Sequence, residues 1–501
     1  MTRSASSGLV KSMVVIGSAQ AVTIALSIVR LKILAVQLGP AGLGLFSIYN
    51  SLQGLVQQAA GLGMSSSGVR EIAASRGEEA PLSRVRRVLL AAHLVQGTLA
   101  LLAVWIMREQ ISIILFDDNA RALQVGLIGV AILLGLFGSA QTALLQGLRK
   151  IADLGSVTVF GACFGTVIGL AAVWLQGENG LIYFVLAQPL GSTLIALHYT
   201  RRLPKPSADR PSLVETWTIW KSMAKLGFAF MLGGFATTAT LLLVRGRISQ
   251  ELGLDAAGQF AASWGITMTY VGFLLGAMGA DYYPRLTEVI QDRKAAVQLM
   301  NDQVQLGLAI GGPVLLLLVG LAPLVITSLY SAEFGPAVGL LQVQTFGNIF
   351  KLASWPLGFS LAAGGHGKTF LLVQINFNVL FLLVLWPTLG PFGIQAAGPA
   401  FTIAYLLHFI LLNFLVRNIH GFLWQRLSLG LIILHAVLAF ALLAAALTFP
   451  LTAALLSPIL ALLTGLFGLR VVLSKIGPES RIAARFSELY ARFGWPLKEV
   501  S

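Results

Sequence analysis

About fourteen apolar segments, each of roughly 20 residues, follow one another along this chain, and a helix of that length crosses the roughly 30 Å hydrocarbon core of a bilayer. Tight Gly-Pro connections such as Gly39-Pro40 leave no room for a soluble domain between them. The composition agrees, because 56% of the residues are hydrophobic and only 11% are charged. The sequence therefore predicts an all-α polytopic membrane protein with about 14 transmembrane helices. The expected spans are residues 11–37, 41–65, 88–107, 123–147, 152–175, 180–199, 222–249, 256–282, 300–329, 335–363, 369–388, 392–416, 427–448 and 451–473.

A sparse internal repeat relates the first part of the chain to the second. Residues 29–33 (Val-Arg-Leu-Lys-Ile) resemble residues 244–248 (Val-Arg-Gly-Arg-Ile), and the Leu-Gly pair at 38–39 recurs at 252–253. Chance likeness between glycine-rich helices is the alternative. Repeated halves around a site near the membrane midplane are common in secondary transporters, so we expect two pseudo-symmetric six-helix bundles followed by a C-terminal helix pair. The expected parts are an N-terminal bundle (1–203), a cytoplasmic linker (204–220), a C-terminal bundle (221–420), an extra transmembrane helix pair (421–474) and a cytoplasmic amphipathic tail (475–501).

The distribution of charge predicts how the chain is oriented. Its 34 Lys and Arg residues outnumber 20 Asp and Glu residues, and they fall mostly in every second connection. By the positive-inside rule these connections and both termini are cytoplasmic. Such short basic clusters favour contact with anionic membrane lipids and not with nucleic acid.

Two smaller patterns concern packing. Gly161, Gly165 and Gly169 recur every fourth residue and predict a helix face that allows close helix contact. In the tail, an apolar face flanked by arginines predicts an interfacial amphipathic helix. The apolar positions of that face are Ile482, Phe486, Leu489 and Phe493.

Five basic residues lie inside expected spans, where a charge costs roughly 2.5 to 3.5 kcal/mol even on lenient insertion scales. They are Arg30, Lys32, Arg245, Arg247 and Lys351. Snorkelling to the interface is the alternative for the first four, whereas Lys351 lies in the middle of its segment. The pattern predicts a cationic cavity shared by the two halves.

Other polar residues are weaker candidates. Asp281 could carry a coupling ion or act as a counter-ion, or it could simply form a helical pair with Arg285. Asn50, Gln58 and Tyr270 could bind a polar ligand or hold neighbouring helices together.

Catalytic chemistry is not indicated. The single cysteine excludes a disulfide framework and a thiolate metal cluster. We find no paired acids, nucleophile motif or phosphate loop in the sequence, so we expect no catalytic residues, no metal site and no cofactor.

Three motifs carry a family resemblance: residues 38–44 (Leu-Gly-Pro-Ala-Gly-Leu-Gly), 281–286 (Asp-Tyr-Tyr-Pro-Arg-Leu) and 329–334 (Leu-Tyr-Ser-Ala-Glu-Phe). With the duplicated plan they resemble Wzx-type O-antigen and polysaccharide flippases of the multidrug/oligosaccharidyl-lipid/polysaccharide exporter superfamily. The resemblance covers nearly the whole chain, and the extra helix pair resembles the lipid II flippase branch. It implies that a V-shaped pair of bundles moves an undecaprenyl-diphosphate-linked oligosaccharide across the bacterial inner membrane by alternating access, driven by an ion or proton gradient.

The resemblance also implies roles for the candidate residues. Arg30, Arg245 and Arg247 would clamp the diphosphate and Lys32 and Lys351 would add positive field, since guanidiniums bind phosphate through paired hydrogen bonds. For Asn50, Gln58 and Tyr270 the glycan would be the polar ligand considered above, and Asp281 keeps the coupling, counter-ion and helical-pair alternatives. The implied partners are the lipid-linked oligosaccharide and other polysaccharide assembly proteins.

Three alternatives stay open. A lipid II-type exporter or a multidrug exporter of the same superfamily would share the fold, although a cavity for cationic drugs should be acidic and aromatic. A membrane glycan polymerase would need a large outer loop, and the outer connections here are short.

Overall fold

The computed structural model describes residues 3–204, 211–476 and Tyr490. These residues form fourteen α-helices and three short 3-10 helices, and no strand occurs among them. The prediction of an all-α polytopic membrane protein is confirmed. The helices are α1 (Arg3–Gly61), α2 (Met64–Ala74), α3 (Glu79–Ile106), α4 (Arg108–Phe116), α5 (Ala122–Gly147), α6 (Ile151–Gln176), η1 (Gly177–Asn179), α7 (Gly180–Arg201), α8 (Leu213–Val289), α9 (Arg293–Leu329), η2 (Ala332–Phe334), α10 (Ala337–Ala363), α11 (Gly367–Phe392), η3 (Gly393–Ala396), α12 (Ala397–His420), α13 (Arg426–Thr448) and α14 (Pro450–Ile476).

Each predicted span overlaps a helix, and the first two spans fall mainly in α1 and the seventh and eighth in α8. The short helices α2 and α4 were not predicted as separate elements. In the described ranges, nine helical stretches are long and apolar enough to cross a membrane. Helix α10 is not among them, and it carries the buried polar residues Gln342, Gln344 and Asn348 together with Lys351. Helix α10 therefore carries several polar side chains into the interior of unit 2.

The chain divides into two compact units, which are described separately. Unit 1 comprises residues 1–261 and 329–333, and unit 2 comprises residues 262–328 and 334–501. The five-part division expected from the sequence stays a prediction. Helix α8 begins at Leu213, inside the expected linker, and the apolar positions of the amphipathic tail lie outside the described residues.

The two repeated Leu-Gly pairs form equivalent bends in unit 1. Gly39 interrupts α1 with φ of 62°, and Gly253 interrupts α8 with φ of 85°. Both lie in the left-handed region that side chains disfavour, which explains why glycine stands at both positions. Just beyond the bends, Gly258 packs directly on the carbonyl of Pro40, and Gly44 packs on the carbonyl of Leu254. The repeated segments therefore meet backbone to backbone, in support of the repeat inferred from sequence.

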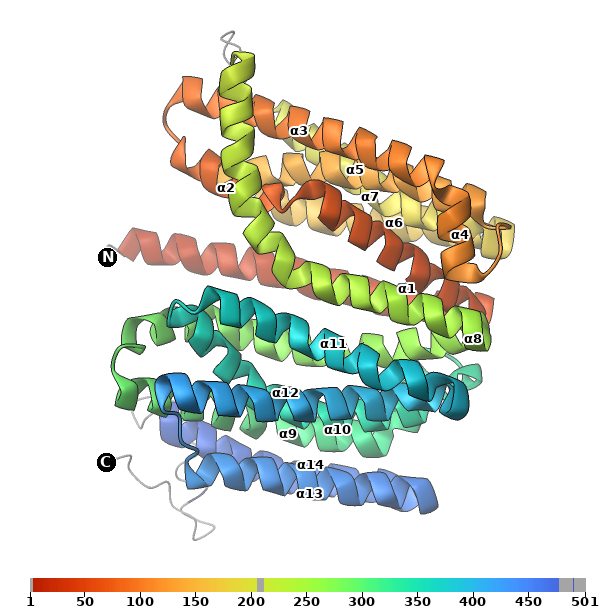
Figure 1. Cartoon of the computed structure of the whole chain (residues 1–501), viewed down its shortest axis with the longest axis vertical. Coiled ribbons are helices and arrows are strands. Elements are labelled where there is room, and N and C mark those ends of the chain that lie inside the picture. The colour runs from red at the N-terminus through yellow and green to blue at the C-terminus, as the bar shows by residue number, and fades with distance from the viewer. Residues whose placement is uncertain (1–2, 205–210, 477–489, 491–501) are drawn as a thin grey trace. The chain divides into compact units, whose positions relative to one another are not determined.

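Helices α3, α5, α6 and α7 pack side by side in unit 1 (Figure 1), and the glycine face of α6 makes the closest of these contacts. A methyl group added at Gly165 would lie only 2.7 Å from the Cα atom of Gln188 on α7. Gly161 and Gly169 likewise face Ser192 and Phe184. The predicted close helix contact along this glycine face is confirmed.

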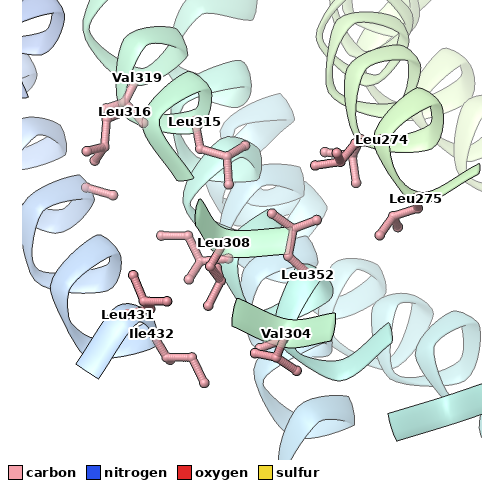
Figure 2. Packing of buried hydrophobic residues seen from close by; sticks show 14 of the residues in the cluster. Leu274, Leu275, Val304, Leu308, Leu315, Leu316, Val319, Leu352, Leu431 and Ile432 are labelled. Atoms are coloured by element: carbon pink, nitrogen blue, oxygen red, sulfur yellow. The ribbon is translucent and has the colours of Figure 1, made fainter. Parts of the chain in front are cut away.

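Unit 2 has a continuous apolar core to which the C-terminal helix pair contributes. Leu274 and Leu275 of α8 pack with residues of α9 and α10, and Leu431 and Ile432 of α13 complete the cluster (Figure 2). Close packing of these apolar side chains holds α13 against α9.

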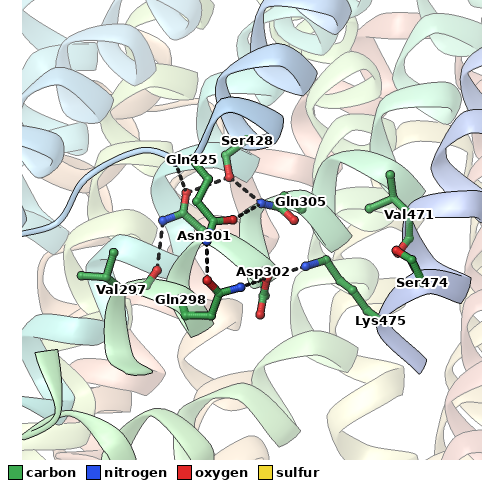
Figure 3. A network of polar contacts seen from close by, with 10 residues as sticks. All are labelled: Val297, Gln298, Asn301, Asp302, Gln305, Gln425, Ser428, Val471, Ser474 and Lys475. Carbon is green, nitrogen blue, oxygen red and sulfur yellow. Dashed lines mark hydrogen bonds and ion pairs between the residues drawn. The ribbon is translucent and has the colours of Figure 1, made fainter. Parts of the chain in front are cut away.

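A polar network adds a second attachment of the helix pair to α9. The Asn301 carboxamide oxygen accepts hydrogen bonds from the Gln425 backbone at 2.9 Å and from the Ser428 hydroxyl at 2.7 Å (Figure 3). At the other end of the network, Lys475 of α14 pairs with Asp302 of α9. Hydrogen bonds and ion pairs between helices fix how the helices are aligned along their axes, which apolar packing alone does not.

We predict that Gly258→Ala will destabilise the protein by about 1–3 kcal/mol, because the added methyl group would overlap the Pro40 carbonyl. Thermal unfolding in detergent measures the effect. Gly272→Ala is the matched control on the same helix, since nothing lies within 4 Å of the position its methyl group would take. Equal melting temperatures for the two variants would contradict the packing argument.

Candidate functional site

The site in unit 1 is built on the face of α7 that packs against the α6 glycines. Phe184, Gln188 and Ser192 lie four residues apart and therefore on one side of the helix. Because glycine offers no side chain at the facing positions, α7 approaches closely, and these three residues also line a cavity. The glycine face of α6 thus sets the position of α7, and with it the position of the cavity-lining residues Phe184, Gln188 and Ser192.

Arg30 lies against this wall. Its Nη1 atom donates a hydrogen bond of 2.8 Å to the side-chain oxygen of Gln188, and its guanidinium carbon lies 5.7 Å from the ring centre of Phe184 and 5.9 Å from that of Phe46. Cation–π contact at these distances stabilises a partly desolvated guanidinium. Its buried Nε–H has no hydrogen-bond acceptor among the described residues. One donor of Arg30 is therefore left without a partner.

The cavity beside Arg30 has a volume of about 400 Å³. Its lining is dominated by neutral amides, hydroxyls and glycines, with no acidic residue in the set, so it offers hydrogen bonds without negative charge. The lining residues are Phe46, Asn50, Gln53, Gly54, Gln57, Gly135, Gly138, Ser139, Thr142, Phe184, Val185, Gln188, Pro189, Ser192 and Thr193.

A second cavity of about 480 Å³ adjoins the first, and Gly54, Gln57 and Ser139 line both. Gln58 contributes to its wall, where its side-chain oxygen accepts a hydrogen bond of 3.1 Å from the Thr238 hydroxyl. His93 also lines it. Unit 1 therefore contains two neighbouring polar cavities between its helices.

Arg245 makes a different contact from its counterpart Arg30. Its Nη1 atom donates to the backbone carbonyl of Ser47 at 3.2 Å and to the hydroxyl of Ser51, both on α1. The buried Nε–H finds no acceptor in the described part of the chain. The repeated arginines thus both retain an unused donor, although their surroundings differ.

Lys32 and Arg247 have strong local partners. The Lys32 ammonium donates to the backbone carbonyl of Tyr330, and Arg247 pairs with Glu251 one helical turn away. These contacts stabilise both charges within unit 1 itself.

Lys351 is the basic residue predicted for unit 2. Its ammonium lies 3.2 Å from the sulfur of Met268 and 5.3 Å from the ring centre of Tyr405. Gln344 and Asn348 occupy the same face of α10, and the Gln344 amide nitrogen and the Asn348 amide oxygen have no partner within the described residues. A thioether and an aromatic ring compensate the charge of an ammonium only in part. This face of α10 therefore has a partly compensated ammonium beside an unused amide donor and an unused amide acceptor.

The remaining candidates, Asp281 and Tyr270, line neither cavity of unit 1 and, within the described residues, form no hydrogen bond or ion pair with the basic residues described above. Asp281 forms an ion pair of 3.1 Å with Arg285, one turn along α8, and both side chains are exposed. Tyr270 packs against the apolar cluster of unit 2. The coupling role of Asp281 and the ligand role of Tyr270 stay predictions.

Unit 1 brings together several residues that the sequence singled out, since Arg30 lies against the first cavity, Asn50 lines it and Gln58 lines the second. Sequence reasoning missed Gln188, the partner of Arg30. The available signal was a Gln-Pro pair at 188–189 within an otherwise apolar span.

Comparison with known proteins connects these cavities to a biological process. A family model described as "Polysaccharide biosynthesis protein" matches residues 33–339, which is more than half of the chain. The chain belongs to this polysaccharide biosynthesis protein family. The match includes the whole of α7 and α8 and so covers Gln188 and Arg245.

Similar proteins are flippases and transporters. The family member described here is 22% identical over 388 residues to the lipid III flippase of Escherichia coli (strain K12), across 76% of this chain and 91% of that protein. Its fold is similar to that of the lipid II flippase MurJ in an inward closed conformation, with a TM-score of 0.68 at 14% identity over 92% of this chain and 99% of that one. An inward-facing multidrug resistance MATE transporter of the MOP superfamily gives a TM-score of 0.62 at 17% identity over 80% of this chain and 94% of that one. The resemblance to the flippase superfamily seen in the sequence is confirmed.

We predict that the two polar cavities of unit 1 are hydrated. In a Cys163→Ala background, Ser139→Cys should react with a charged methanethiosulfonate reagent at least about tenfold faster than Val167→Cys, because the reagent and the thiolate both require water. Ser139 lines both cavities, whereas Val167 is 65% exposed at mid-length on the outer surface of α6. Labelling of membranes followed by mass spectrometry measures both rates. Equal slow rates would mean that the cavities are dry.

Proposed function

We propose that this member of the polysaccharide biosynthesis protein family is a flippase for an undecaprenyl-diphosphate-linked oligosaccharide, such as an O-antigen or exopolysaccharide repeat unit. One observation carries the proposal: Arg30, inside the first transmembrane span, is held by Gln188 beside an amide-lined cavity and keeps an unused buried donor. The names of the similar lipid II and lipid III flippases support the same class of substrate.

The chemistry of the cavities suits the two polar parts of such a substrate. A diphosphate is anionic, and guanidiniums bind phosphate oxygens through charge-assisted hydrogen bonds, so we assign this role to Arg30 and Arg245. Sugar hydroxyls exchange hydrogen bonds with carboxamides, so we assign glycan contacts to Asn50 and Gln58. Lys32, Arg247 and Lys351 would add positive field, and the polyprenyl tail would remain in lipid.

Transport would proceed by alternating access in the bacterial inner membrane, with both termini cytoplasmic and an ion or proton gradient as the energy source. Repeated halves support this mechanism, since rocking of one repeat against another is how many such transporters work. The equivalent bends at Gly39 and Gly253 are the structural trace of that repeat.

A lipid II-type substrate is the second candidate. The fold of the lipid II flippase MurJ covers 92% of this chain, compared with 80% for the MATE transporter. Multidrug export is less favoured, because the cavities of unit 1 have no acidic lining residue to attract a cationic drug. Complementation of strains lacking one or the other flippase separates the two lipid-linked substrates.

We predict that Arg30→Ala and Arg245→Ala will each lower glycan export about 10–100-fold while protein level and membrane insertion stay normal, because each removes a charge-assisted contact to the diphosphate. Complementation of a flippase-null strain, with immunoblots of surface glycan, measures export. Arg76→Ala is the control, since Arg76 is an exposed arginine at the end of α2. Full complementation by both cavity variants would refute the assignment.

Lys351→Met should separate transport from folding. The change replaces a partly buried ammonium by an apolar chain of similar length, so thermal stability should stay equal or rise while export falls. Melting temperature and export are measured on the same variant. Normal export together with normal stability would exclude a role for Lys351 in transport.

A further inference from the structure

A basic pocket lies at one end of unit 2, where three helix connections come together. The connections join α8 to α9, α10 to α11 and α12 to α13, and Figure 1 shows them at the same end of this unit. The pocket has a volume of about 370 Å³, within the range of roughly 300–1,000 Å³ typical of small-molecule sites. It is lined by Ile290, Gln291, Arg293, Ala296, Gly364, His366, Arg417, Asn418, Ile419, His420 and Gly421.

Four basic side chains from all three connections face this pocket: Arg293, His366, Arg417 and His420. The imidazoles of His366 and His420 lie edge to face with ring centres 5.7 Å apart, and the buried Nε2 atom of His420 has no partner among residues that the structure describes. Arg293 donates a hydrogen bond of 3.4 Å to the carbonyl of Gly421. The pocket therefore brings together two guanidiniums and two imidazoles.

Two glycines make room for these side chains. The guanidinium of Arg293 packs directly on Gly421, and both imidazoles pack on Gly364, where an added methyl group would lie 2.6 Å from a ring carbon of His420. Arg293 and both imidazoles thus pack on glycine backbone, while Arg293, His366 and Arg417 stay exposed and accessible to a ligand.

Negative charge does not balance the pocket. No acidic residue lines it, and among the described residues neither Arg293 nor Arg417 forms an ion pair. The neighbouring carboxylate of Asp292 is used as a cap, because it accepts backbone hydrogen bonds from Lys294 at 2.9 Å and Ala295 at 3.2 Å. The pocket consequently has an excess of positive charge.

We propose that this pocket binds a phosphate-bearing anion, namely the headgroup of an anionic membrane lipid. Guanidiniums and imidazoles are the side chains that bind phosphate oxygens, and basic pockets between transmembrane helices at the membrane surface bind lipid headgroups. A lipid bound here would connect α9, α11 and α12 and so stabilise unit 2. The site lies wholly within unit 2 and does not depend on the proposed transport function.

Ligand-dependent melting of the full-length protein in a non-ionic detergent tests the site. The probes are dihexanoylphosphatidylglycerol, its zwitterionic counterpart dihexanoylphosphatidylcholine and soluble glycerol phosphate. We expect the phosphatidylglycerol to raise the melting temperature by about 2 °C or more and the phosphatidylcholine to have little effect. Arg417→Gln should weaken the apparent affinity for phosphatidylglycerol at least about tenfold. Arg417 is exposed, so this variant should fold normally.

Matched variants distinguish a built site from general attraction to anionic lipid. Arg426→Gln removes an exposed arginine near the same end of unit 2 that does not line the pocket, and it should leave the response unchanged. Arg30→Ala should also leave it unchanged, which separates this pocket from the proposed transport site. His366→Gln provides a second pocket variant with the same expectation as Arg417→Gln.

The outcomes are decisive in both directions. An equal response to glycerol phosphate would support the anion site but identify a soluble phosphate compound as its ligand. The proposal is overturned if phosphatidylglycerol has no effect on the unmodified protein, if neither pocket variant weakens the response, or if Arg426→Gln weakens it as much as Arg417→Gln does.

Discussion

The contact between the glycine face of α6 and α7 is the interaction on which the site in unit 1 depends. Gly165 lets the backbone of α7 approach so closely that an added methyl group would lie 2.7 Å from the Cα atom of Gln188. That approach sets the position of the Gln188 amide, which holds the Arg30 guanidinium, and of the Phe184 ring beside it. In a lipid environment close packing, and not the hydrophobic effect, fastens helices to one another. The same glycines that make the bundle compact therefore also position its intramembrane cation.

The intramembrane basic residues fall into two groups by how completely they are paired. Arg247 is paired with the carboxylate of Glu251, so a local ion pair accounts for its charge. Arg30, Arg245 and Lys351 are compensated only in part, by neutral oxygens, aromatic rings or a thioether. An incompletely paired buried charge destabilises a protein. On this ground we propose Arg30, Arg245 and Lys351, ahead of the ion-paired Arg247, as the residues that meet a ligand.

The sequence predicted the features that depend on local composition. Segment length predicted the spans. The Leu-Gly pairs marked equivalent positions of a repeat, and the structure shows bends there at Gly39 and Gly253, where glycine is favoured because φ is positive. The sequence did not predict that Gln188 would hold Arg30, since these residues lie 158 positions apart and their contact depends on the rotation of α7 about its axis. Residues 29–33 and 244–248 have similar sequences, but their arginines have different partners. Arg245 contacts serines of α1, which the similarity did not predict. Periodicity reports which face of a helix is buried, but not which partner that face meets.

The difference between Arg30 and Lys351 suggests a division of roles in the proposed transport cycle. A guanidinium has five donors in a fixed plane, so Arg30 can keep its bond to Gln188 while another donor binds a phosphate oxygen. The ammonium of Lys351 is a point charge next to the sulfur of Met268 and the ring of Tyr405, neither of which competes strongly with an anion. Directional recognition of the diphosphate is therefore better assigned to Arg30, and Lys351 is better suited to attract the substrate through its field. Each of these charges is only partly compensated without substrate, which destabilises the folded protein. Substrate that pairs with Arg30 or Lys351 would remove this penalty, so we expect bound substrate to raise the free energy of unfolding.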